Sequence, residues 1–119
     1  MPHATATFAD RTIADATDFQ RVEGNIYFPP SSILDKSVFS PNPTTTVCPW
    51  KGTASYYDVT VDGKTAEAAA WYYPDPKTER AAGLRDYIAF CKFPPIFIFF
   101  ERETEKGGCS FFFLGLLSL

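Results

Sequence analysis

The clearest pattern of polar and apolar positions lies in Gly52–Val61, where successive side chains alternate between two faces. Alternation with a period of two residues predicts a β-strand. The strand ends at Asp62-Gly63, a dipeptide that favours the two-residue turn of a β-hairpin. We therefore predict an antiparallel partner strand over Lys64–Tyr73, although the alanine-rich stretch Ala66–Ala70 has a high helical propensity.

The remaining strands are predicted from shorter β-prone runs that end at turn residues or prolines. They lie at Ala4–Asp15, as a hairpin about Asp10-Arg11, at Phe19–Phe28, at Thr44–Val47 and at Tyr87–Cys91.

Two polar stretches are expected to form short helical turns. The first is Ser31–Asp35, where the hydroxyl of Ser31 or Ser32 can cap the first turn. The second is Lys77–Arg85. The fold class predicted from these elements is mainly β: a small antiparallel barrel or twisted sheet with one or two short helices.

The composition of the chain changes abruptly after Lys92. Seven of the twelve phenylalanines follow this residue, and so dense an apolar stretch indicates an interface or an aggregation-prone segment. Either Ile96–Phe100 supplies an edge strand, or residues 93–119 are foreign to the domain, for example translated non-coding sequence. We predict a single domain over residues 1–92, followed by an atypical Phe-rich tail over residues 93–119.

Charge and cysteine content exclude several classes of partner. The net charge is -3 with a pI near 5.0, so there is no basic face for nucleic acid and we expect no nucleic-acid partner. The three cysteines are odd in number and irregularly spaced, which is typical of a reducing compartment, and we expect a cytoplasmic protein. The start of the chain lacks the pattern of a signal peptide. No apolar run reaches the roughly 20 residues that span a bilayer, so we expect no membrane association.

Four segments of the sequence occur together in one order. They are Gly24-Asn-Ile-Tyr-Phe-Pro-Pro30, Thr44-Thr-Thr-Val-Cys-Pro-Trp-Lys-Gly-Thr-Ala-Ser-Tyr-Tyr57, Ala70-Trp-Tyr-Tyr-Pro-Asp-Pro76 and Tyr87-Ile-Ala-Phe90. In this order they resemble the domain of unknown function 427 family over roughly residues 5–92. The resemblance implies a small, mostly antiparallel β-domain with an aromatic-lined cleft. Members of the family usually continue with a polar strand where this chain has its Phe-rich tail.

The family sometimes carries a nucleotidyltransferase-like label, which the residues of this chain do not support. Such chemistry needs a phosphate-binding loop and paired carboxylates that hold Mg²⁺. The sequence has no Gly-rich phosphate loop, and Asp58 and Asp75 are isolated rather than paired. Nucleotidyl transfer is therefore an alternative that rests on the label alone.

The residues predicted to bind a ligand lie in and near the central motif. They are Cys48, Trp50, Lys51, Tyr56, Trp71, Tyr73 and Tyr27. The Lys51 ammonium would bind an anionic group, or would pair with a carboxylate of this chain, or would be solvated. The aromatic side chains would either line a cleft or form core. Alternation places Tyr56 and Tyr57 on opposite faces of their strand, and likewise Tyr72 and Tyr73.

Covalent or metal chemistry has little support in the sequence. A nucleophilic role for Cys48 would need a base, and the single histidine, His3, lies near the start of the chain. A small buried hydrophobe is the favoured interpretation of Cys48. Cysteine and histidine lack the spacing of a metal site, so we expect no metal and no cofactor.

These observations lead to three hypotheses for the function. The first is a small-molecule-binding domain, with catalysis left open, whose cleft lies between the Cys48–Gly52 turn and the Trp71–Pro74 strand end. The second is a non-catalytic protein-interaction module, which includes a homodimer. The third is the nucleotidyltransferase-type activity of the family label.

Overall fold

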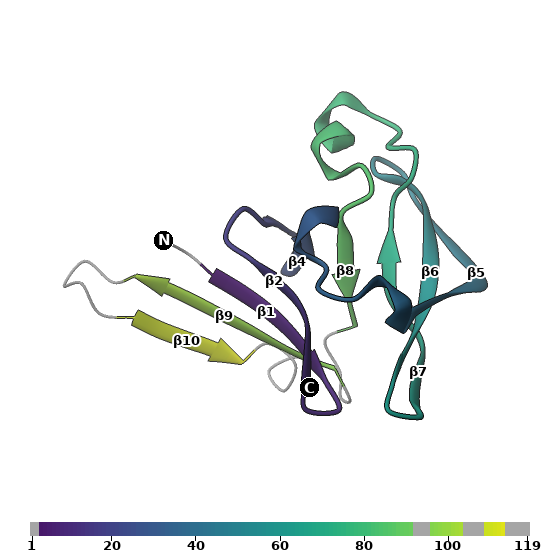
Figure 1. The fold of residues 1–119 in the computed structure, drawn as a ribbon. Helices are drawn as coiled ribbons and strands as arrows, with labels where there is room; N and C mark the ends of the chain where they lie inside the picture. Colours follow the sequence, from purple (N-terminus) through teal and green to yellow (C-terminus); the bar gives the residue numbers. More distant parts are fainter. Residues whose placement is uncertain (1–2, 92–95, 104–108, 114–119) are drawn as a thin grey trace.

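The computed structural model of the chain describes residues 3–91, 96–103 and 109–113. It consists of two antiparallel sheets, and short 3-10 segments connect strands within the larger sheet (Figure 1). The strand order is β10-β9-β1-β2 in the four-stranded sheet and β3-β4-β8-β7-β6-β5 in the six-stranded sheet. Within the described residues neither order closes on itself. The mainly β prediction is therefore confirmed, as open sheets rather than as a barrel.

The four-stranded sheet begins with the predicted N-terminal hairpin. Its strands are β1 (His3–Phe8), β2 (Arg11–Ala16), β9 (Phe97–Glu103) and β10 (Cys109–Phe113). The β1–β2 turn falls on Ala9 and Asp10, one residue before the predicted break, and both residues have positive φ angles of 51° and 64°. Positive φ at both central residues is typical of the tight turn that suits the twist of a hairpin.

The six-stranded sheet contains the central motif. Its strands are β3 (Gln20–Val22), β4 (Asn25–Phe28), β5 (Phe39–Cys48), β6 (Gly52–Val61), β7 (Lys64–Tyr72) and β8 (Ile88–Phe90). The β6 strand has the predicted bounds. Asp62 and Gly63 form the β6–β7 turn with φ angles of 50° and 78°, so the predicted hairpin is confirmed and the helical alternative for Ala66–Ala70 is excluded.

The β5 strand is longer than predicted, because it passes through Pro41 and Pro43. Both prolines lack a backbone donor, but β5 is an edge strand of its sheet and can lose donors there. Its register with β6 shifts between Asn42 and Thr45. The Asn42 side chain holds this irregularity, since it donates to Asp58 Oδ1 and accepts from the backbone N–H of Thr44, each over 2.8 Å.

The helical segments among the described residues are short 3-10 helices of three to six residues. They are η1 (Pro30–Ser32), η2 (Lys36–Val38) and η3 (Glu79–Leu84). The expectation that Ser31 or Ser32 caps the first turn was wrong. Pro29 occupies the cap position without a side-chain hydrogen bond, and the Ser32 hydroxyl donates back to the Pro29 carbonyl over 2.7 Å.

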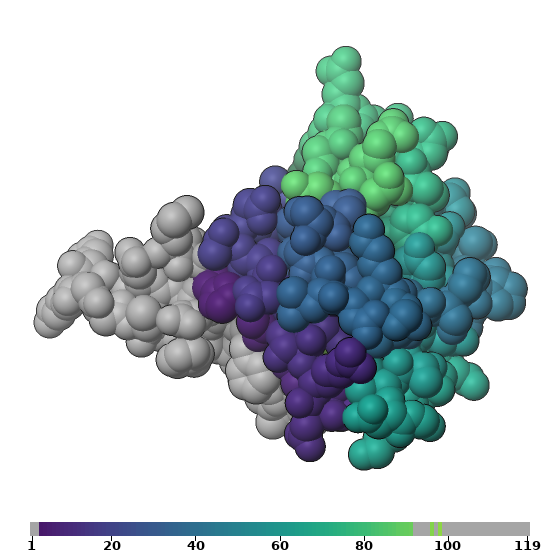
Figure 2. All heavy atoms as spheres, viewed as in Figure 1, coloured from purple at the N-terminus to yellow at the C-terminus, as the bar shows by residue number. Residues whose placement is uncertain are grey.

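Two clusters of buried side chains lie on opposite faces of the six-stranded sheet. The main core lies between the two sheets and includes Phe28, Val59 and Phe90. The second cluster lies on the other face, beneath the segment that carries η3, and is built around Tyr27, Ala54, Tyr73, Leu84 and Ala89. Figure 2 shows the segment from η1 to β5, in blue, lying across the viewed face between the purple β1–β2 hairpin and the teal strands.

The strand expected at Ile96–Phe100 is present as β9, but it is not an edge strand. It lies between β1 and β10, and the described side chains of Ile96 and Ile98 are buried in the main core. Residues 92–95, 104–108 and 114–119 lie outside the described residues. The predicted domain end at residue 92 and the foreign origin of the tail stay predictions.

Candidate functional site

The structure brings the predicted site residues together around Lys51, in the turn between β5 and β6. The Lys51 side chain is buried, with the residue only 6% exposed. Its Nζ donates to a carboxylate oxygen of Glu23 and lies 3.5 Å from the Tyr27 hydroxyl. Of the three alternatives for this ammonium, pairing with a carboxylate of the same chain is the one that the structure shows.

Aromatic rings enclose the same ammonium. Lys51 Nζ lies 5.8 Å from the ring centroid of Tyr27 and 5.5 Å from those of Trp50 and Tyr73. Each distance is within the range of a cation–π interaction. We call Lys51, Glu23 and these three rings the lysine cage.

The other predicted aromatics extend the lysine cage along the sheet. The indole Nε1 of Trp71 donates to the Tyr27 hydroxyl over 3.3 Å. The rings of Tyr56 and Trp71 lie 6.1 Å apart, and the Tyr56 hydroxyl bonds to Thr46 Oγ1 over 3.0 Å. Cys48 is a free thiol packed against the same cluster, and it is half-buried rather than buried.

The electrostatics of the lysine cage keep Lys51 protonated and Tyr73 neutral at pH 7. Burial alone lowers the pKa of Lys51, but the hydrogen bond with Glu23 and the neighbouring Tyr27 and Tyr73 outweigh it, so the pKa is raised. Burial and the neighbouring Tyr27 raise the pKa of Tyr73 to about 12. Neither group is suited to general acid–base catalysis at pH 7.

The turn that carries Lys51 is clamped by the segment that follows β7. The backbone N–H of Lys77 donates to the Lys51 carbonyl over 3.1 Å, and the Thr78 hydroxyl donates to the Trp50 carbonyl over 2.9 Å. The Arg80 guanidinium lies 4.4 Å from the centroid of the Trp50 ring. These contacts order the turn and fix the position of the lysine cage.

A broad groove of about 630 Å³ lies where the cleft was expected, between the β5–β6 turn and the end of β7. Its lining is mostly small or polar: Val47, Gly52, Thr53, Ser55, Pro74, Asp75, Pro76 and Lys77. None of the seven predicted residues lines it. Tyr27, Lys51 and Tyr73 are buried, and Cys48, Trp50, Tyr56 and Trp71 are half-buried. Their binding role stays a prediction.

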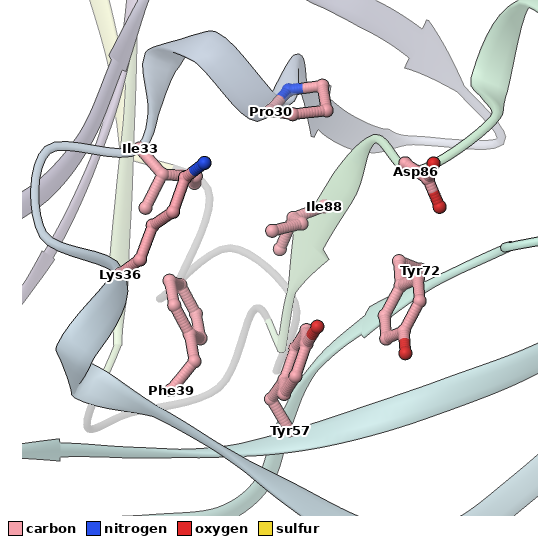
Figure 3. Close-up of a pocket in the computed structure, with 8 residues that line it drawn as sticks. All are labelled: Pro30, Ile33, Lys36, Phe39, Tyr57, Tyr72, Asp86 and Ile88. Atoms are coloured by element: carbon pink, nitrogen blue, oxygen red, sulfur yellow. The ribbon is translucent and has the colours of Figure 1, made fainter.

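A smaller pocket of about 300 Å³ lies on the face of the six-stranded sheet opposite the lysine cage (Figure 3). We call it the tyrosine pocket. It is lined by residues from four stretches of the chain: Pro30, Ile33, Lys36 and Phe39 from the first, Tyr57 and Tyr72 from β6 and β7, and Asp86 and Ile88 from the last.

One wall of the tyrosine pocket is a row of three aromatic rings on neighbouring strands. The rings of Phe39 and Tyr57 lie 5.3 Å apart. Those of Tyr57 and Tyr72 are stacked, 4.9 Å apart with an angle of 16° between their planes. Tyr57 is paired with Ala70 across the strands, so Tyr72 is its diagonal neighbour, which is within reach of an aromatic side chain.

The polar groups of the tyrosine pocket lie at its sides. Burial, the hydrogen bond with Tyr72 and the negative charge of Asp86 raise the pKa of Tyr57 to about 12. Its hydroxyl is therefore neutral at pH 7 and can donate or accept a hydrogen bond. Lys36 and Asp86 lie on opposite sides of the pocket, with Ile88 between them and the two tyrosines below in the view of Figure 3.

Sequence reasoning missed the tyrosine pocket, although one signal for it was present. Alternation placed Tyr57 opposite Tyr56 on one strand and Tyr72 opposite Tyr73 on the other, and the structure adds that Tyr57 and Tyr72 share a face. The alternation could not predict where the segment from Pro30 to Phe39 lies. Its path across that face depends on contacts with strands that are distant in the sequence.

Two further features of the described residues limit the chemistry. In the part of the chain that the structure describes, no three His, Cys, Asp or Glu side chains gather as a metal ion would require. No helix within these residues is long and apolar enough to cross a membrane.

Comparison with known proteins identifies the chain at the level of a family. The model of a family described as a domain of unknown function (DUF427) matches residues 2–95. The chain matches no curated protein. The resemblance found in the sequence is thus confirmed.

Proposed function

We propose that this chain, which belongs to the DUF427 family, is a small-molecule-binding domain whose ligand occupies the tyrosine pocket. The observation that carries the proposal is a hollow of about 300 Å³ walled by three aromatic rings. Pockets for small ligands have volumes from about 300 Å³ upwards, with mostly apolar walls and a few polar groups.

Lys36 takes the role that the sequence suggested for Lys51. The Lys51 ammonium is buried and paired with Glu23, so an anionic ligand would have to displace an internal carboxylate. Lys36 is exposed and lines the tyrosine pocket. An ammonium at the mouth of an apolar pocket can bind the anionic group of a ligand while the rings contact its body.

A thermal-shift screen of small aromatic and aliphatic compounds tests this proposal. A ligand present at about 100 times its Kd should stabilise the fold by about 2.7 kcal/mol, which is a rise in Tm of roughly 10 °C. Tyr57→Ala should remove this rise, because it removes the centre of the aromatic wall.

Tyr56→Ala is the matched control, since Tyr56 is also half-buried and lies next to Tyr57 on the opposite face of β6. Each shift is measured against the variant's own ligand-free Tm, so a general loss of stability cancels. Equal loss of the shift in both variants would contradict the proposed site. If no compound stabilises the protein and it elutes as a dimer, the protein-interaction module is the better explanation.

A further inference from the structure

We infer that the ligand of the tyrosine pocket is a zwitterion with separated charges, whose anionic end faces Lys36 and whose cationic end faces Asp86. The inference rests on the proposed function, and it adds the class of ligand. The observation behind it is the arrangement in Figure 3, where one ammonium and one carboxylate lie on opposite sides of an apolar and aromatic pocket.

The charge of Lys36 is not neutralised by its neighbour in the sequence. Asp35 is adjacent and acidic, but its Oδ2 accepts from Arg11 Nη2 over 2.8 Å. Its Oδ1 accepts from the backbone N–H of Ser37 over 3.0 Å, as the cap of η2. The carboxylate nearest to Lys36 along the chain is therefore already occupied.

Asp86 has the corresponding arrangement with opposite signs. Its basic neighbour, Arg85, donates from Nη1 to the Pro74 carbonyl over 3.1 Å. The backbone N–H of Asp86 donates to the Tyr73 carbonyl over 3.1 Å, which holds the residue in a left-handed conformation with φ of 63°. The backbone is thus fixed where the carboxylate borders the pocket.

Among the residues that the structure describes, neither Lys36 nor Asp86 forms an ion pair within the chain. A ligand with one charge would neutralise one of these groups and partly desolvate the other without a partner, which costs free energy. A zwitterion pairs with both. The apolar ring or chain between its charges would lie on Ile88 and the stacked tyrosines.

Calorimetric titration of the full chain with matched compounds tests the inference. The zwitterions are 4-(aminomethyl)benzoate and 8-aminooctanoate. The single-charge analogues are 4-methylbenzoate and octanoate for the anion, and 4-methylbenzylamine and octylamine for the cation. Because both charged groups are exposed, each ion pair is weak, and we expect the better zwitterion to bind about threefold to fivefold more tightly than either of its analogues.

Two variants assign the two ends of the ligand. Lys36→Met should remove the advantage of the zwitterion over the amine, and Asp86→Asn should remove its advantage over the acid. Asparagine tolerates positive φ, so Asp86→Asn keeps the local backbone and removes the charge alone.

The outcomes separate this inference from the proposed function. Analogues that bind as tightly as the zwitterions, in a manner that depends on Tyr57, would overturn the zwitterion and leave the binding site in place. An advantage of the zwitterion that survives both charge variants would also overturn it. If no compound of the wider screen binds the wild-type protein, the proposed function itself fails.

Discussion

Lys51 obtains its ion-pair partner from a distant part of the fold. Its ammonium is held by Glu23, a residue 28 positions earlier in the chain, which lies in the β3–β4 turn with φ of 53°. Three rings complete the lysine cage. The sequence could identify an ammonium among aromatics, but it could not supply the partner, because no local pattern links two turns so far apart.

We predict that removing the two charges of the lysine cage changes the free energy of unfolding by unequal amounts. Glu23→Gln leaves the buried Lys51 ammonium without its counter-ion, and should cost about 1–2 kcal/mol of unfolding free energy, less than a fully buried pair because Glu23 is partly exposed. Lys51→Met replaces the ammonium with an apolar chain of similar length and should change stability by less than about 1 kcal/mol. Chemical denaturation measures both.

The double variant is the control. With Lys51 already methionine, Glu23→Gln should have almost no further effect, since the charge that it leaves unpaired is gone. A Glu23→Gln variant as stable as the wild type would show that the rings and water alone satisfy the ammonium.

At the scale of elements, the features that depend on neighbouring residues were predictable. The period of β6 and the Asp62-Gly63 turn are local, and both are found where they were predicted. The extent of β5 depends instead on its place at the edge of the sheet, where Pro41 and Pro43 are tolerated. A single sequence does not reveal which strand is at the edge, so the first half of β5 was missed.

We predict that replacing glycines by alanine lowers the stability by different amounts, most of all at Gly52 in the β5–β6 turn. Gly52 has φ of 110°, and an added Cβ would lie 3.0 Å from the Asp75 carbonyl oxygen. Gly52→Ala should therefore cost about 2–3 kcal/mol, from backbone strain and from the clash with the clamping segment. Chemical denaturation measures the loss.

Two other glycines separate these contributions. Gly63 has φ of 78° but open space around its Cβ position, so Gly63→Ala should cost about 1 kcal/mol, from strain alone. Gly83 has neither feature among the described contacts, and Gly83→Ala should be neutral or slightly stabilising. Equal losses of stability in Gly52→Ala and Gly63→Ala would show that the segment around Asp75 moves away from the added Cβ without a further loss of stability.

At the scale of the whole molecule, the two faces of the six-stranded sheet have different roles. One face carries the lysine cage, which is filled by its own side chains. The other carries the main core and, at its margin, the tyrosine pocket. Alternation along β6 and β7 predicted that there would be two faces. Which face keeps an open pocket depends on the segments that cover the sheet. Pro30–Phe39 covers one face and η3 covers the other, and the packing of both segments depends on residues far away in the sequence.

The four-stranded sheet raises the last question at this scale, which is whether the Phe-rich tail belongs to the fold. Ile98 on β9 is 2% exposed and packs in the main core beside Ala4 and Ala6 of β1. If the tail is part of the fold, Ile98→Ala should cost about 2–5 kcal/mol, because it leaves a cavity between the sheets. Urea denaturation should show a lower midpoint with an unchanged slope.

Val47→Ala is the control, since Val47 is 75% exposed and its truncation should cost less than about 0.5 kcal/mol. An Ile98→Ala variant as stable as Val47→Ala would mean that β9 does not support the core, and would favour a domain that ends at residue 92.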